Sequence, residues 1–176
     1  MNIKKAVFVI AFKNFRDEEY FQPKEVLERA GFEVITVSTE IGMAQGTEGG
    51  EVDITTTVDQ IKIDEFDVII FVGGQGMLKN VENKRVHHLA QQASKSGKLI
   101  GAICIAPIVL AKAGVLEGKK ATVWASALDR RPVQALIEEG AIYENKPIVV
   151  DGKIVTASGP QVARQFGEKI VEISRS

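Results

Sequence analysis

Residues 99–113 read L-I-G-A-I-C-I-A-P-I-V-L-A-K-A, and the remainder of the fold is organised around this stretch. The apolar residues 99–103 predict a buried strand, and the second apolar run, which contains Pro107, predicts a helix. The one cysteine of the chain, Cys104, falls on the turn between them. A side chain on such a turn projects from the carboxyl edge of a sheet toward a helix amino end, as in a nucleophile elbow. We therefore expect a reactive thiol, whose pKa is lowered by the helix dipole and by free backbone N–H groups.

The composition indicates an ordinary globular domain. The chain has 176 residues, of which 45% are hydrophobic and 26% charged, and its formal net charge is −1. This length suits one domain, residues 1–176, with a sizeable core. The charge gives no reason to expect binding to nucleic acid or to an anionic membrane, and no apolar stretch approaches the roughly 20 residues of a membrane span. One cysteine forbids an internal disulfide, and the chain start lacks a signal-peptide pattern, so we expect a cytoplasmic protein.

Strand-like and helix-like segments alternate along the chain. Apolar runs predict strands at 4–12, 33–38, 67–72, 98–103 and 122–124, with a hairpin at 148–156. Helices are predicted at 17–30 (with a kink or a fresh start at Pro23), 81–96, 105–113 and 132–139, and after Pro160. The glycine-punctuated residues 42–58 predict small accessory hairpins outside the main sheet. The fold class is therefore α/β, a doubly wound and mostly parallel sheet flanked by helices on both faces.

Three loops are predicted to meet where the strands end. They are residues 12–19, the Gly73-Gly74-Gln75-Gly76 turn, and Cys104. Ligands of such sheets bind beyond the carboxyl ends of the strands, so this coincidence predicts a functional site. The backbone N–H groups of Gly74 and Ile105 are placed to stabilise an oxyanion beside the thiol. The glycine turn lacks the spacing of a dinucleotide-binding fingerprint.

Acidic residues are available to assist the thiol, whereas histidines are not. A buried carboxyl beside Cys104 would have a raised pKa and, when protonated, could donate a hydrogen bond to the sulfur. Asp17, Glu18 and Glu19 all qualify, although each also suits the first turn of a helix, where Asp17 can act as the cap. The only histidines, His87 and His88, are adjacent on a predicted helix and are expected at the surface. A zinc site and a Cys-His-Asp triad are therefore disfavoured.

The sequence resembles the ThiJ/PfpI superfamily over essentially its whole length. The resemblance rests on A-I-C-I-A-P at 102–107, V-G-G-Q-G at 72–76 and D-E-E-Y-F-Q-P at 17–23. It implies a flavodoxin-like fold of the class I glutamine amidotransferase type. It also implies that Glu19 is the carboxyl that contacts the thiol, that Gly73 lines the pocket, and that the amides of Gly74 and Ile105 are of the oxyanion type. Members of the superfamily are typically homodimers, and the hairpins at 42–58 are candidates for the interface.

Two departures from the family pattern bear on activity. The protease-like branch has histidine directly after the cysteine, whereas this chain has Ile105. The parkinsonism-associated branch, described as a redox-responsive chaperone and a glyoxalase or deglycase, has no histidine there and resembles this chain more closely. That branch carries a histidine near the thiol on the strand after the elbow helix. The matching position here is Trp124, which predicts a bulkier pocket that is less able to move protons.

Three functions follow from these residues. In the first, a Cys104 thiolate attacks a small electrophilic carbonyl such as a 2-oxoaldehyde, Glu19 moves the proton, and neither metal nor organic cofactor takes part. In the second, the protein is a non-catalytic redox sensor or chaperone-like stress protein that uses oxidation of Cys104. The third, an intracellular peptidase or amidase, is disfavoured because the usual histidine is missing.

Overall fold

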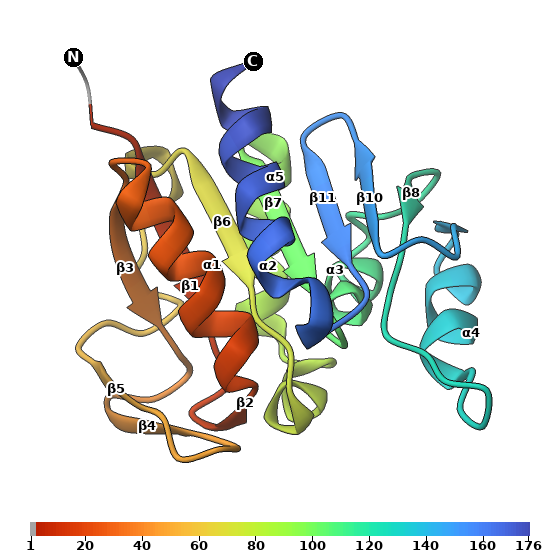
Figure 1. The fold of residues 1–176 in the computed structure, drawn as a ribbon, viewed down its shortest axis with the longest axis horizontal. Coiled ribbons are helices and arrows are strands. Elements are labelled where there is room, and N and C mark those ends of the chain that lie inside the picture. The colour runs from red at the N-terminus through yellow and green to blue at the C-terminus, as the bar shows by residue number, and fades with distance from the viewer. Residues whose placement is uncertain (1–2) are drawn as a thin grey trace.

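A six-stranded sheet forms the centre of the computed structural model, which describes residues 3–176 (Figure 1). Its strands are β1 (Lys5–Val9), β3 (Glu33–Val37), β6 (Val68–Phe71), β7 (Leu99–Ile103), β10 (Ile148–Asp151) and β11 (Ile154–Ala157). They lie in the order β10-β11-β7-β6-β1-β3, and all neighbours pair in parallel except β10 with β11. The predicted α/β fold with a mostly parallel sheet is therefore confirmed.

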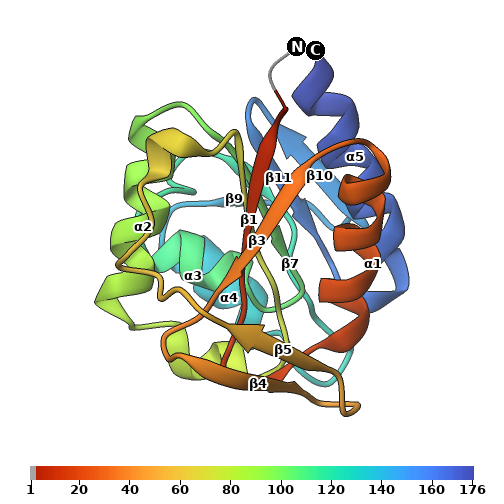
Figure 2. The same ribbon diagram turned by 90° about the vertical axis from the view of Figure 1, so that its left-hand side faces the viewer.

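Helices cover both faces of this sheet. They are α1 (Asp17–Arg29), α2 (Lys84–Lys95), α3 (Pro107–Lys112), α4 (Arg131–Glu138) and α5 (Ala163–Arg175), with short 3-10 turns η1 (Ile63–Glu65), η2 (Gln75–Asn80) and η3 (Pro160–Val162). Figure 2 shows α1 and α5 on one face and α2 and α3 on the other. Because side chains alternate along a strand, β1 supplies both cores. Ala6 and Phe8 pack with α1 and α5, whereas Val7 and Val9 pack in the core under α2 and α3.

A small second sheet lies at the carboxyl ends of the central strands (Figure 1). It consists of β2 (Lys13–Phe15), β4 (Gly42–Gly46) and β5 (Glu51–Ile54), in the order β2-β4-β5. Strands β4 and β5 form the predicted accessory hairpin, which is antiparallel, and β2 pairs with β4 in parallel. The hairpin therefore sits beside the loops that follow β1 and β6, at the edge where the sequence predicts a site.

Residues 122–124 do not form the predicted strand. A two-residue strand, β8 (Lys120–Ala121), precedes them and pairs with β9 (Ile142–Tyr143). The reason lies in their hydrogen bonds. The Thr122 N–H donates to the hydroxyl of Thr156 at 2.9 Å, and the Trp124 N–H donates to the carbonyl of Cys104 at 2.9 Å. The segment is thus bound to the end of the main sheet and to the elbow, not to a strand partner.

The helix ends also differ from expectation. Asp17 is not the cap of α1 but its first residue, because Arg16 takes the cap position without a capping side-chain bond. Pro23 lies inside a single helix, and no new helix starts there. Helix α2 begins at Lys84, since the Asn83 side chain accepts the first free N–H groups. None of the helices within residues 3–176 is long and apolar enough to cross a membrane.

Candidate active site

Cys104 occupies a strained turn between β7 and α3. Its φ angle is +63°, a left-handed conformation that few residues other than glycine adopt. Backbone bonds fix this conformation, since the Cys104 N–H donates to Ala157 O at 2.8 Å and the Cys104 carbonyl accepts from Trp124 N. The residue is only 9% exposed. Strain that the surrounding structure maintains in this way is typical of functional sites, and the geometry is that of the predicted elbow.

Glu19 lies against this thiol. It belongs to the first turn of α1 and is 0% exposed, and neither of its carboxyl oxygens makes a hydrogen bond of ordinary geometry within the described residues. Gly73 marks how close the two side chains are. A Cβ atom at Gly73 would overlap Glu19 Oε2 and would lie 2.7 Å from Cys104 Cβ. Only a glycine leaves room for the carboxyl and the thiol to meet, so these three residues form the centre of the site.

Burial dominates the electrostatics of Glu19. It raises the pKa of this carboxyl to about 7, because a charged group loses its hydration there. The Cys104 thiol, the Gly73 N–H and the Arg16 cation oppose this rise in pKa. At and below neutral pH the carboxyl therefore retains its proton to a large extent and can act as a hydrogen-bond donor.

The thiol does not have the lowered pKa that the sequence predicts. Burial raises the pKa of Cys104, as does the adjacent carboxylate of Glu19, whereas N–H groups of Ile105 and Gly74 act in the opposite direction. Two negative charges in contact repel each other, so the pair carries a single negative charge over a wide pH range. Reactivity then depends on whether that charge lies on the sulfur or on the carboxylate.

The structure distinguishes three acidic residues that the sequence leaves equivalent. Glu18 points away from the thiol and is bound by the Arg16 guanidinium at 2.9 and 3.0 Å, which lowers the pKa of Glu18. The carboxylate of Asp17 accepts backbone N–H groups of the β4–β5 turn. Glu19 alone of the three is fully buried beside Cys104.

The remaining predicted site residues belong to the segments that adjoin Gly73 and Cys104. Gly74 has a φ of +108°, and a Cβ there would lie 2.5 Å from Arg16 N, so its loop packs tightly on the chain entering α1. Ile105 and Trp124 are both partly buried and pack against the core cluster that contains Cys104.

The structure brings in Arg16 as well, which the sequence does not single out. The sequence does not indicate a role for Arg16, because its ion-pair partners, Glu18 and Glu48, are ordinary surface acids.

The histidines lie elsewhere. His87 and His88 belong to α2, which covers the opposite face of the sheet from α1 (Figure 2). The ring nitrogen Nε2 of His87 is 2.6 Å from the Val81 carbonyl oxygen. Among the residues that the structure describes, no three His, Cys, Asp or Glu side chains gather closely enough to hold a metal ion. Of the acidic and imidazole side chains described above, Glu19 is the one that lies buried beside Cys104.

Known proteins resemble this chain over most of its length. A profile of the DJ-1/PfpI family matches residues 4–173. An uncharacterized protein of Methanocaldococcus jannaschii is 38% identical over 98% of this chain and 83% of its own length. The deglycase PfpI of Pyrococcus furiosus is 30% identical over 88% of this chain and 90% of its own. A Caenorhabditis elegans protein named glutathione-independent glyoxalase is 28% identical, over 96% and 88%.

A solved structure shows the same fold over the whole chain. The ThiJ/PfpI domain protein of Brachyspira murdochii superposes with a TM-score of 0.93 at 30% sequence identity, covering 99% of this chain and 98% of that one.

Proposed function

Since this chain belongs to the DJ-1/PfpI family, we propose that it is a cysteine-dependent enzyme that acts on small electrophilic carbonyls, as a glyoxalase or deglycase does. The single observation that carries the proposal is the contact between the buried Glu19 carboxyl and the Cys104 thiol across Gly73. Relatives named deglycase and glyoxalase support the substrate class. The Cys104 residue is only 9% exposed, which also favours a small substrate.

The site residues allow a balanced reaction with a 2-oxoaldehyde. The Cys104 sulfur adds to the aldehyde carbon, and the carbonyl oxygen takes the proton of Glu19, which gives a hemithioacetal. The Glu19 carboxylate then removes the proton from that carbon and returns it to the neighbouring ketone carbon, while the hydroxyl proton of the hemithioacetal moves to the former ketone oxygen, which leaves a 2-hydroxy thioester. Water hydrolyses the thioester to a 2-hydroxy acid and regenerates the thiol. The N–H groups of Gly74 and Ile105 face the sulfur and stabilise the oxyanions on these intermediates.

The test is turnover of methylglyoxal, measured as lactate formed. We expect turnover by the wild type and a loss of about 100-fold or more in Cys104→Ser and Glu19→Gln, because each removes the nucleophile or the group that moves the proton. Glu168→Gln, which removes an exposed carboxylate from α5, serves as the control and is expected to retain wild-type turnover. A wild type without turnover above background, or a Glu19→Gln variant at the wild-type rate, contradicts the proposal.

One observation favours a second function, that of an oxidation sensor. The two histidines lie on the other face of the sheet, and oxidation of a thiolate needs no general base. The N–H groups that face the sulfur would also hold a sulfinate. To test this function, the wild type and the Glu19→Gln variant are treated with dilute peroxide and their intact masses are measured. Oxygen uptake at Cys104 that depends on Glu19, in a protein without turnover, assigns the sensor function.

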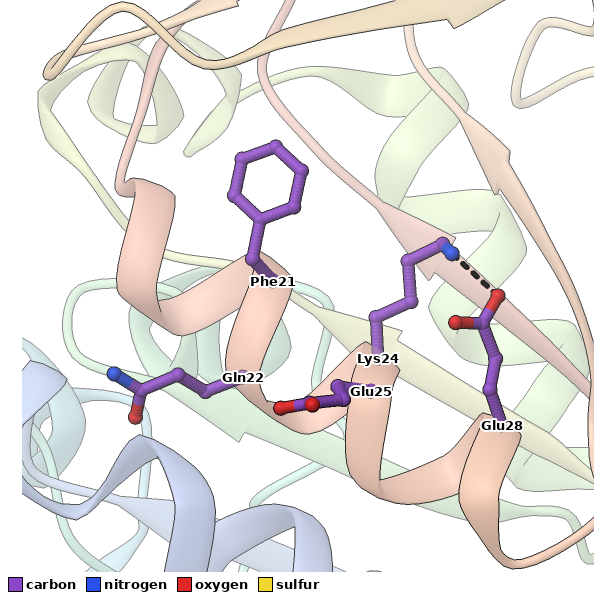
Figure 3. A pocket seen from close by; sticks show the side chains of 5 residues that line it. All are labelled: Phe21, Gln22, Lys24, Glu25 and Glu28. Carbon is purple, nitrogen blue, oxygen red and sulfur yellow. Dashed lines mark hydrogen bonds and ion pairs between the residues drawn. The ribbon is translucent and has the colours of Figure 1, made fainter.

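We also propose that two copies associate through α1 and the β4–β5 hairpin. Phe21, Ile41 and Met43 are 41%, 60% and 50% exposed there. Figure 3 shows the side chains around a hollow of about 320 Å³ along α1, which are Phe21, Gln22, Lys24, Glu25 and Glu28. Lys24 is bonded to Glu28 at its rim. Exposed apolar side chains on these two elements, together with the positive and negative charges along α1, suit a second copy of the chain.

Sedimentation equilibrium measures this association. We expect a wild-type mass of about twice the 19.2 kDa of one chain, and a shift toward the single-chain mass in Phe21→Glu, because a charge would be buried without a partner. Leu128→Glu changes a fully exposed residue in the loop before α4 and should leave the mass unchanged. A monomeric wild type refutes the proposal.

A further inference from the structure

We propose that Asp17 is a positioning residue, which fastens the β4–β5 turn to the start of α1 and so holds Glu19 against the Cys104 thiol. The inference rests on the proposed role of the Cys104–Glu19 pair and assigns to Asp17 the control of the reactivity of that pair. Asp17 does not touch the sulfur or a substrate. Its effect passes through the first turn of α1, on which Glu19 follows two residues later.

Both carboxylate oxygens of Asp17 accept hydrogen bonds from the backbone of the hairpin turn. Its Oδ2 accepts the Glu48 N–H at 2.8 Å, and its Oδ1 accepts the Gly50 N–H at 2.7 Å. The turn between β4 and β5 is closed by a bond from Gly46 N to Gly50 O at 2.7 Å. A Cβ atom at Gly46 would lie only 2.5 Å from both carboxyl oxygens. The backbone of the turn therefore approaches Asp17 as closely as glycine permits.

Further bonds bind the same stretch of chain from both sides. On the hairpin side, the Gln45 N–H donates a hydrogen bond to the Phe12 carbonyl at 3.0 Å, and the Thr47 N–H donates one to the Phe15 carbonyl at 2.9 Å. On the other side, the Arg16 N–H donates to the carbonyl of Gly73 at 3.1 Å. The segment that enters α1 is thus enclosed between the hairpin and the loop that touches both Glu19 and the thiol.

The first turn of α1 needs this external support. Arg16 offers no capping side-chain bond, so the free N–H groups at this helix end have no side-chain acceptor from the cap position. Pro23 has no N–H, and the carbonyl of Glu19 therefore lacks the helical bond that residue i+4 would supply. The helix ladder is weakened at the residue whose position matters most, and Asp17 supplies an anchor from outside the helix.

The proposal predicts that loss of the Asp17 carboxylate slows the reaction of the Cys104 thiol, whereas a pure charge effect would make the reaction faster. Asp17→Asn leaves one acceptor oxygen for two N–H groups, so the turn loosens and protonated Glu19 donates less well to the sulfur. Below pH 7, where Glu19 retains most of its proton, the thiolate is then less favoured and reacts more slowly. If Asp17 acted only through its negative charge, its removal would favour ionisation nearby and the thiol would react faster. Gly46→Ala opens the same contact sterically and leaves the charge in place.

The experiment measures iodoacetamide alkylation of Cys104 between pH 5.5 and 9.5 by intact mass. We expect at least threefold slower alkylation at pH 6 in Asp17→Asn and in Gly46→Ala, because Glu19 is largely protonated there and its hydrogen bond to the sulfur favours the thiolate. Asp53→Asn, an exposed carboxylate on β5 of the same hairpin, should behave as the wild type. Faster hydrogen exchange at the amides of Glu48 and Gly50 should accompany the effect.

The outcomes separate this inference from the proposed function. A Gly46→Ala variant at the wild-type rate, or an Asp17→Asn variant that reacts faster, overturns the positioning role while the Cys104–Glu19 pair stands. A Glu19→Gln variant with the wild-type pH dependence overturns the pair and the positioning role together. Gly46→Ala decides the question alone if Asp17→Asn fails to fold.

Discussion

Glu19→Gln is expected to stabilise the folded protein at pH 8 while it removes activity toward carbonyls. Burial raises the pKa of Glu19 from 4.5 to about 7 in the folded state. Between these two values the unfolded chain releases the proton and the folded chain keeps it, so stability falls as the pH rises and levels off once both states are ionised. The shift corresponds to about 3 kcal/mol, which the uncharged amide of Gln avoids.

Urea unfolding of wild type and variant at pH 4.5 and pH 8 measures this effect. Other groups change the stability of both proteins alike, so the difference between the two proteins is the informative quantity. We expect that difference to move by about 3 kcal/mol in favour of Glu19→Gln as the pH rises. For the control Glu168→Gln, which changes an exposed residue, the difference in unfolding free energy from the wild type should not change with pH. A difference that stays constant with pH would mean that the pKa of Glu19 is the same in the folded and the unfolded protein.

The elbow could be predicted because its signals are local. The apolar run of β7, Cys104 and Pro107 are contiguous, and each fixes a backbone preference at its own position. The glycines after β6 could be placed for the same reason. The parallel sheet then brings their ends to one edge, which the alternation of strands and helices already implies.

The choice of Glu19 over its neighbours could not be derived from local signals. Asp17, Glu18 and Glu19 are equally suited to a helix start, and they differ only in what packs against each of them. Glu18 finds Arg16 nearby, but the partners of Asp17 lie more than 30 residues away on a hairpin turn. Contacts of that range leave no periodicity in the sequence. Only the resemblance to a known family pointed to Glu19 in advance.

The strand predicted at 122–124 was wrong for a related reason. Its apolar and β-branched residues have strand propensity, but propensity does not decide which backbone partner is available. Here the Trp124 N–H donates a hydrogen bond to the carbonyl of Cys104, and the Thr122 N–H donates one to the Thr156 side chain of β11. The direction of the thiol pKa was missed likewise, since burial against a carboxyl is a tertiary property.

Gly73→Ala is expected to abolish activity and to destabilise the fold by about 1–3 kcal/mol. The added Cβ would overlap Glu19 Oε2 and would lie 2.7 Å from both Cys104 Cβ and Ile103 O. Two of these neighbours, the strained Cys104 and a backbone carbonyl of β7, have little freedom to move. The carboxyl must therefore retreat from the thiol. Methylglyoxal turnover should fall about 100-fold or more, as in Glu19→Gln, and urea unfolding gives the loss of stability.

Gly101→Ala separates the loss of the contact from a general loss of stability. Its Cβ would meet Ile170 Cδ1 at 2.7 Å and Phe166 Cζ at 2.9 Å, which are the ends of side chains on α5 that can shift. The variant should be destabilised by a similar amount and yet retain most of the turnover. If Gly73→Ala retained more than a tenth of the wild-type turnover, the carboxyl and the thiol would not need to touch during the reaction. Glu19 would then have to act through water, and the glycine would serve only the packing of the loop after β6.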